Sequence, residues 1–220
     1  MIRNLKFQCA KPLNGLSEHL TKVTLSVLLA AGLMSGCADK TERIDMNNDK
    51  GDQVMGLDYR DFNQAAAEAI QSMLMSGALD KKSGDRYVLA ISRVSNDTMQ
   101  HIDTDQLIKK IRVELLKSGK VVVTTAVSAN GPEDAMSKQA RELRNDDEFN
   151  QRTVQKKGQM VAPDMSLSGK ILQRNVRMDD GKQQVEYYFM LSLTEIKTGL
   201  AWWEGETIIG KRGSGKSVSW

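Results

Sequence analysis

A strictly alternating stretch near the C-terminus constrains the fold of this 220-residue chain most. In VEYYFMLSLTEI, every second residue from Val185 to Leu193 is apolar: Val185, Tyr187, Phe189, Leu191 and Leu193. A period of two places these side chains on one face of a β-strand. The stretch therefore predicts a half-buried antiparallel strand, in a sheet that is covered on one face.

Turn residues on both sides of this strand predict two further strands. Residues 165–178 lead into it through the turn-rich sequence DDGKQ, and KTG at 197–199 leads out of it into residues 200–210. Short Asp- and Gly-containing connections of this kind favour hairpins. A three-stranded antiparallel meander is thus expected, with the adjacent Trp202 and Trp203 on opposite faces of the sheet.

The preceding part of the chain alternates helical and strand patterns. Apolar residues recur at three- and four-residue spacing in two segments, and two short β-rich runs follow them. The expected elements are a helix capped by Asp58 or Asp61 and stopped by Gly77, a strand at 87–94, a helix from Asp103 or Thr104 to Gly119, and a strand at 121–127. The strand–helix–strand order makes a crossover unit, so these two strands should be parallel.

A highly charged region at 133–157 is expected to be helical, with a solvated outer face and a sparse apolar side against the sheet. The cluster of Asn145, Asp146 and Asp147 should divide it. Together these patterns predict the α/β class, a single-domain sandwich at 58–220 with a mixed sheet of about five strands and helices packed on it.

The N-terminus carries the pattern of a secretion signal. Residues 23–37, VTLSVLLAAGLMSGC, form an apolar core too short to span a membrane, after a front with four basic residues, and Ser35 and Gly36 precede Cys37. This arrangement looks like a bacterial lipoprotein signal, in which the cysteine becomes the acylated first residue of the mature chain. We therefore expect a signal peptide at 1–36, with lipidation at Cys37 and several acyl chains that hold the protein on a membrane.

Removal of the signal changes the charge of the chain. The 31 basic and 28 acidic residues lose four cations and Glu18, which leaves 27 of each. A neutral chain without a basic stripe gives no footprint for nucleic acid. Cys9 leaves with the signal, so no disulfide is expected. Residues 37–57 are expected to be the lipidated cysteine and a flexible polar tether.

Signals for chemistry are weak. GKRGSGKS at 210–217 has the spacing of a phosphate-binding loop, but only three residues follow it, too few for the helix that such a site requires, so we expect no nucleotide. His101 is the one histidine left after the signal, which disfavours a histidine triad or a metal site. The aspartate pairs at 146–147 and 179–180 fit turns. No catalytic, cofactor or metal residues are therefore expected, and the chain should not be an enzyme.

Several ordered segments resemble one known family. They are YRDFNQAAAEAIQSML, YVLAISRVSNDT, IDTDQLIKKIRVELLKSGKVVVTT and EIKTGLAWWEGE, after the lipoprotein cysteine and its polar tether. The chain resembles the LpoB family of outer-membrane lipoproteins, which activate bifunctional penicillin-binding proteins in peptidoglycan synthesis. This resemblance implies an α/β sandwich without an active site, whose partner is the periplasmic domain of such a synthase.

The residue after Cys37 is Ala38 rather than the aspartate that commonly retains lipoproteins at the inner membrane. By resemblance to that sorting pattern we expect the outer membrane, with the domain facing the periplasm. The alternative left open is a structural or assembly lipoprotein, accessory to outer-membrane secretion or surface-organelle machinery.

Overall fold

Five strands form one mixed sheet in the computed structural model, which describes residues 41, 43–46, 48, 51, 53–129, 131–178 and 181–214. The chain divides into two compact units, Met1–Asp49 and Lys50–Trp220. In the first unit, the described residues include a turn closed by the N–H of Asn48 on the carbonyl of Asp45 at 3.0 Å. Every helix and strand described below belongs to the second unit.

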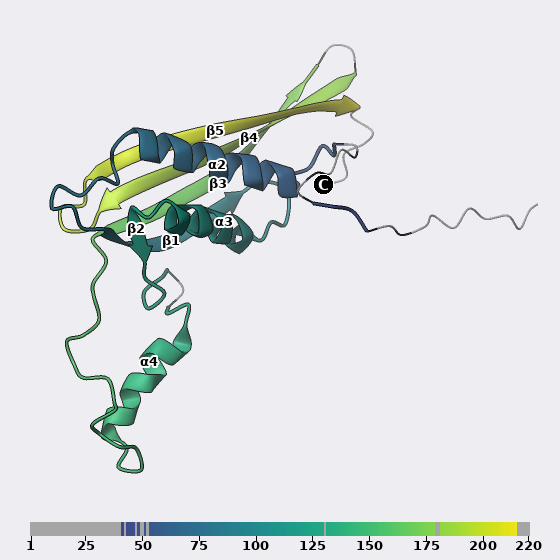
Figure 1. Cartoon of the computed structure of the whole chain (residues 1–220). Helices are drawn as coiled ribbons and strands as arrows, with labels where there is room; N and C mark the ends of the chain where they lie inside the picture. Colours follow the sequence, from purple (N-terminus) through teal and green to yellow (C-terminus); the bar gives the residue numbers. More distant parts are fainter. Residues whose placement is uncertain are drawn as a thin grey trace, which may run out of the picture. The chain divides into compact units, whose positions relative to one another are not determined.

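The sheet has the order β2-β1-β3-β4-β5 (Figure 1). Its strands are β1 (Tyr87–Asp97), β2 (Val121–Val123), β3 (Met165–Arg177), β4 (Lys182–Glu195) and β5 (Ala201–Ser214). β1 runs parallel to both β2 and β3, whereas β3, β4 and β5 form an antiparallel meander. The predicted mixed sheet, crossover and meander are all confirmed.

Helix α2 (Tyr59–Met75) begins at a double cap. The Asp58 carboxylate accepts from the backbone N–H groups of Arg60 and Asp61, and the Asp61 carboxylate accepts from the N–H of Asp58 in return. This reciprocal arrangement satisfies donors that a helix start leaves unpaired. Both predicted capping residues thus take part, with Asp58 as the N-cap.

Helix α3 (Thr104–Lys117) is capped by Asp103, whose side chain accepts from the N–H of Asp105. Both α2 and α3 stop just before a glycine in the left-handed region, Gly77 at φ 72° and Gly119 at φ 69°. A side chain at such a φ is strained, so glycine is the favoured residue after a helix end. The predicted ends of both helices are therefore confirmed.

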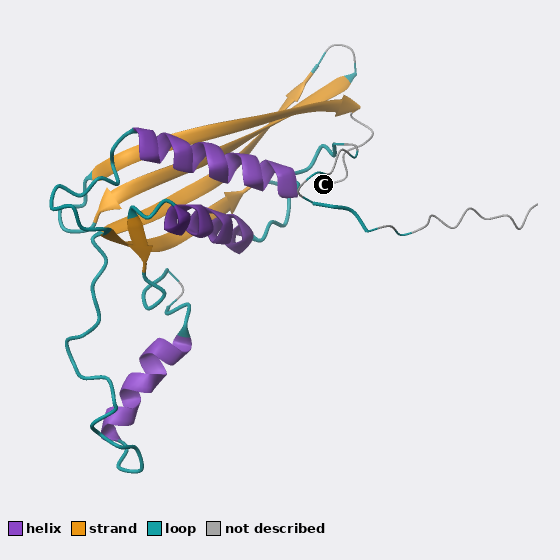
Figure 2. Ribbon diagram, in the orientation of Figure 1, coloured by secondary structure: helices purple, strands orange, loops and turns teal. Residues whose placement is uncertain are grey.

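The core lies between the sheet and these two helices, which pack side by side on one face (Figure 2). The alternating residues of β4 are buried as predicted, and Phe189 meets Phe62 of α2 edge-on, with ring centroids 6.0 Å apart. Trp203 is buried in the core, whereas Trp202 is exposed, which confirms the prediction that they face opposite sides.

Two close approaches on the helix-covered face require glycine. Gly169 of β3 and Gly205 of β5 both stand opposite Leu191 of β4. A Cβ on Gly169 would lie 2.6 Å from the Met190 carbonyl oxygen, and one on Gly205 would lie 2.3 Å from the Trp203 ring. The missing side chain of Gly205 thus makes room for the indole.

Two expectations were wrong. The strand expected at 121–127 ends at Val123, because the chain then turns: the Thr125 carbonyl accepts from the N–H groups of Glu133 and Asp134. The charged region at 133–157 yields only α4 (Ala135–Glu142) and the short η2 (Leu143–Asn145), followed by turns.

The charged region also does not cover the sheet, since neither α4 nor η2 has a buried residue. Its apolar side chains are too few to bury a face, and Met136 is 63% exposed. The predicted break at 145–147 is present, because η2 ends at Asn145.

Candidate docking surface

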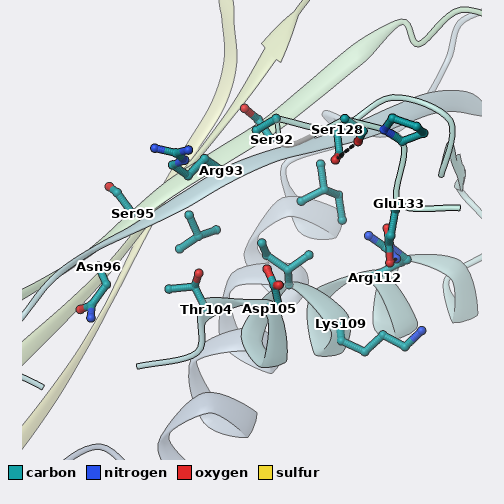
Figure 3. A pocket seen from close by; sticks show the side chains of 16 residues that line it. Ser92, Arg93, Ser95, Asn96, Thr104, Asp105, Lys109, Arg112, Ser128 and Glu133 are labelled. Carbon is teal, nitrogen blue, oxygen red and sulfur yellow. Dashed lines mark hydrogen bonds and ion pairs between the residues drawn. The ribbon is translucent and has the colours of Figure 1, made fainter. Parts of the chain in front are cut away.

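A groove runs along the outer edge of β1 in the part of the strand beyond β2 (Figure 3). Its volume is about 790 Å³. One wall is β1 at residues 91–96 and the second is α3. Residues 128, 129 and 131–133 of the following loop line it as well. We call this feature the β1-edge groove.

The groove exists because β2 is short. The ladder between β1 and β2 joins only Tyr87–Leu89 to Val121–Val123, whereas β1 continues to Asp97. The last bond on this side runs from the N–H of Thr124 to the carbonyl of Leu89, at 2.9 Å. Beyond Leu89, the described strands pair β1 with β3 only.

The orientation of β1 identifies which of its backbone groups face the groove. The carbonyl of Leu89 faces β2, whereas that of Val88 faces β3, where it accepts from the N–H of Asp164 at 2.7 Å. Successive residues of a strand point these groups to opposite edges. A residue of β1 whose side chain lies on the same face as that of Leu89 therefore points its backbone N–H and C=O away from β3.

A bulge shifts this alternation by one residue. Ile91 pairs with Leu167 and Val94 pairs with Gly169, so Ser92 and Arg93 together face one residue of β3. Bulges of this kind re-aim a strand and strengthen its twist. Past the bulge, the outward backbone groups belong to Val94 and Asn96, and before it to Ile91. Within the described chain, no backbone hydrogen bond reaches these groups from the groove side.

Positive charge gathers at one end of the groove. Arg112 of α3, only 8% exposed, forms an ion pair with Glu133 of the loop. The hydrogen bond from Arg112 lowers the pKa of Glu133 below its usual value, despite partial burial, and the charge of Lys109 acts in the same direction. The buried Nε of Arg112 has no hydrogen-bond partner among the described residues. The positive charges of Arg112 and Lys109 therefore both act on the Glu133 carboxylate at this end of the groove.

A second polar cluster attaches the segment before α2 to the sheet. Lys211 of β5, with its side chain 6% exposed, donates to Asp61 at 2.5 Å and to the carbonyl of Gly56 at 2.7 Å. Met55 and Leu57 pack against the core beside it. We call residues 55–57 the strap.

Tyr187 of β4 reinforces the strap. Its hydroxyl donates to the backbone carbonyl of Met55 at 3.1 Å and accepts from the side-chain amide of Gln100 at 2.6 Å. The side-chain oxygen of the same amide, Gln100 Oε1, accepts from the N–H of Leu57. Burial raises the pKa of the Tyr187 hydroxyl to about 12. The strap is thus fixed by hydrogen bonds from β4, β5 and the loop after β1.

The residues singled out in the sequence lie mostly elsewhere. Cys37, Asp179, Asp180, Lys216 and Ser217 lie outside the described residues. Gly210–Ser214, the start of the apparent phosphate loop, are extended and paired with β4. That conformation is unlike a phosphate-binding loop, which must curve around its ligand.

His101 is exposed in the loop after β1, and Asp146 and Asp147 lie at the turn that follows η2. Among the described residues, no group of three His, Cys, Asp or Glu side chains could hold a metal ion. In the same part of the chain, no helix is long and apolar enough to cross a membrane.

Sequence reasoning missed the β1-edge groove. The strand predicted at 87–94 continues to Asp97, and part of this longer strand lines the groove. Lys109 and Arg112 lie within the predicted helix that ends at Gly119, and Glu133 begins the charged region, so no sequence pattern set them apart as a site. The usable signal was the turn at Gly131 and Pro132, which brings Glu133 back toward α3.

In this α/β domain no described strand pairs with the outer edge of β1 beyond β2, and that edge lies in a groove between α3 and a loop. An unpaired strand edge in a groove is a feature of protein-binding modules. The model of the peptidoglycan-synthase activator LpoB family matches residues 61–209, and the chain belongs to this family. It is a family of outer-membrane lipoproteins that regulate peptidoglycan synthesis rather than catalyse a reaction. The resemblance found in the sequence is confirmed.

Solved structures with similarity to the chain include two LpoB C-terminal domains. The domain from Salmonella enterica is 17% identical, with 68% of this chain and 98% of that one covered and a TM-score of 0.38. The domain from Escherichia coli is 14% identical, with 69% of this chain and 99% of that one covered and a TM-score of 0.38. The PelC dodecamer from Paraburkholderia phytofirmans is 16% identical, with 57% of this chain and 72% of that one covered and a TM-score of 0.30. No curated protein sequence matches the chain.

Proposed function

We propose that this protein is a lipid-anchored activator that binds the periplasmic domain of a bifunctional penicillin-binding protein directly and stimulates its synthesis of peptidoglycan. The family match over residues 61–209 carries this proposal. The acyl chains on Cys37 anchor the protein in the outer membrane, and the domain faces the periplasm.

An activator of this kind needs no reaction of its own. It raises the synthase's activity when it binds the active conformation more tightly than the inactive one, and the shift is limited by that difference in affinity. The strap fixes where the tether ends. With residues 55–57 held on the domain, the extended tether from Cys37 reaches about 60 Å, at roughly 3.5 Å per residue.

The test uses the chain from residue 37, purified in detergent, with each bifunctional penicillin-binding protein of the same cell. We expect a faster rate of glycan polymerisation from lipid II with at least one synthase, and a complex that co-purifies. An unchanged rate with every synthase would reject the proposal. Co-purification with an outer-membrane channel and no synthase would indicate the assembly role instead.

The anchor is tested separately in growing cells. A fatty-acid probe should label the protein, and Cys37→Ser should remove the label and release the protein from the membrane fraction. A labelled Cys37→Ser variant would show that the lipid is attached elsewhere.

A further inference from the structure

We propose that the β1-edge groove binds one extended segment of the synthase, which adds to the sheet as a strand beside β1 and places an acidic side chain near Lys109 and Arg112. This inference rests on the proposed function and assigns its contact surface.

The first support is the backbone of β1. The N–H and C=O groups of Ile91, Val94 and Asn96 point into the groove, and no described backbone group pairs with them there. Peptides add to open sheet edges through backbone donors and acceptors of this kind, and an added strand would have to follow the bulge between Ile91 and Val94. From Ile91 to Asn96 the edge is about 17 Å long, the length of a common strand.

The second support is the short β2. Its ladder ends at Val123, and the chain then turns at Thr125; residues 128, 129 and 131–133 line the groove. The place that a longer β2 would occupy beside β1 is thereby part of the groove. An added segment would lie in the plane of the sheet and cover an edge that proteins otherwise protect from pairing.

The third support is charge. Five ionisable side chains line the groove, three basic and two acidic: Arg93, Lys109, Arg112, Asp105 and Glu133. At the α3 end, Lys109 and Arg112 act on the same carboxylate of Glu133. A further acceptor in the groove would complement the exposed ammonium of Lys109 and the Arg112 guanidinium beside it. An acidic side chain on the added segment supplies this acceptor.

Hydrogen exchange tests the strand addition. The chain from residue 37 is followed with and without the periplasmic region of the synthase that it stimulates. We expect the amides of Ile91, Val94 and Asn96 to exchange at least tenfold more slowly in the complex. The amides of Ala90 and Ser95, which face β3, serve as internal controls and should change little. A stimulated synthase with unchanged exchange at the three outward amides would overturn the inference and leave the proposed function intact.

Charge reversal provides the second measurement. Lys109→Glu should weaken synthase binding at least fivefold, and the loss should shrink at high salt. Lys138→Glu makes the same change on α4, outside the groove, and should alter binding less than twofold. Equal effects of the two variants would overturn the assignment of the acidic contact.

Two further results of these measurements would lead to different conclusions. Slower exchange in the chain alone as its concentration rises would assign the edge to a second copy, and would overturn the inference. Absence of both binding and stimulation would reject the proposed function itself, and the inference with it.

Discussion

Replacing Lys211 with methionine should lower the free energy of unfolding by about 3 kcal/mol. The side chains of Lys211 and Asp61 are 6% and 9% exposed, and their charged groups lie 2.5 Å apart. Methionine fills the space but leaves the Asp61 carboxylate buried without its cation. Loss of one partner of a buried pair costs about 3–5 kcal/mol. We expect the lower end, because Asp61 still accepts from the N–H of Asp58.

Urea unfolding of the wild-type and variant chains measures this difference. A loss of 3 kcal/mol reduces the ratio of folded to unfolded protein by about two orders of magnitude. Arg212→Met is the matched control: the neighbouring side chain lies on the other face and is exposed, so its effect should stay within about 0.5 kcal/mol.

A double-mutant cycle separates the ion pair from packing. Adding Asp61→Asn to Lys211→Met removes the stranded charge, so the double variant should be more stable than Lys211→Met alone. The pair would not stabilise the domain as described if the free energy of unfolding of Lys211→Met lay within about 0.5 kcal/mol of the wild-type value. The same conclusion would follow if the double variant lost the sum of the two single-variant changes in that free energy.

Three other perturbations follow from the same contacts. Gly205→Ala should destabilise the domain by about 1–3 kcal/mol and shift tryptophan fluorescence to the red, because the added Cβ would clash with the Trp203 ring. Gly210→Ala on the same strand has no atom within 4 Å of its added Cβ, so it should change neither stability nor fluorescence. Burial raises the pKa of the Tyr187 hydroxyl to about 12, so this hydroxyl loses its proton at a lower pH in the unfolded state than in the folded one, and the free energy of unfolding should fall as the pH rises from about 10 to 12. Tyr187→Phe should lack this part of the fall, and identical pH profiles of stability for the two chains would refute the burial argument. The N–H of Val88 and the ammonium of Lys81 lower the pKa of Asp164 below 3.8, so part of the stability should disappear as the pH falls below about 4, and Asp164→Asn should flatten that acid limb.

The parts of the fold that follow from local patterns were predictable from the sequence. The ends of α2 and α3 depend on side chains next to them, Asp58, Asp103, Gly77 and Gly119. The meander follows from a period of two and from turn residues between its strands. In these cases, the physical cause of the element lies within a few residues of it.

The parts that were missed depend on contacts between distant residues. VVVTTAV is β-prone throughout, and the bonds that end β2 at Val123 come from Glu133 and Asp134. The strap is held by Lys211, which is 150 residues from Asp61 and 155 from Gly56. The groove combines α3 with a loop that showed no periodic pattern. The acyl anchor at Cys37 stays a prediction.

The packing of α2 against β5 has a consequence for how the domain is made. The first helix of the domain finds its ionic partner and much of its apolar cover on the last strand. A nascent chain leaves the ribosome with α2 early and Lys211 near the end, so its interior cannot close while synthesis is under way. The core face of α2 thus stays incompletely covered until β5 has been made.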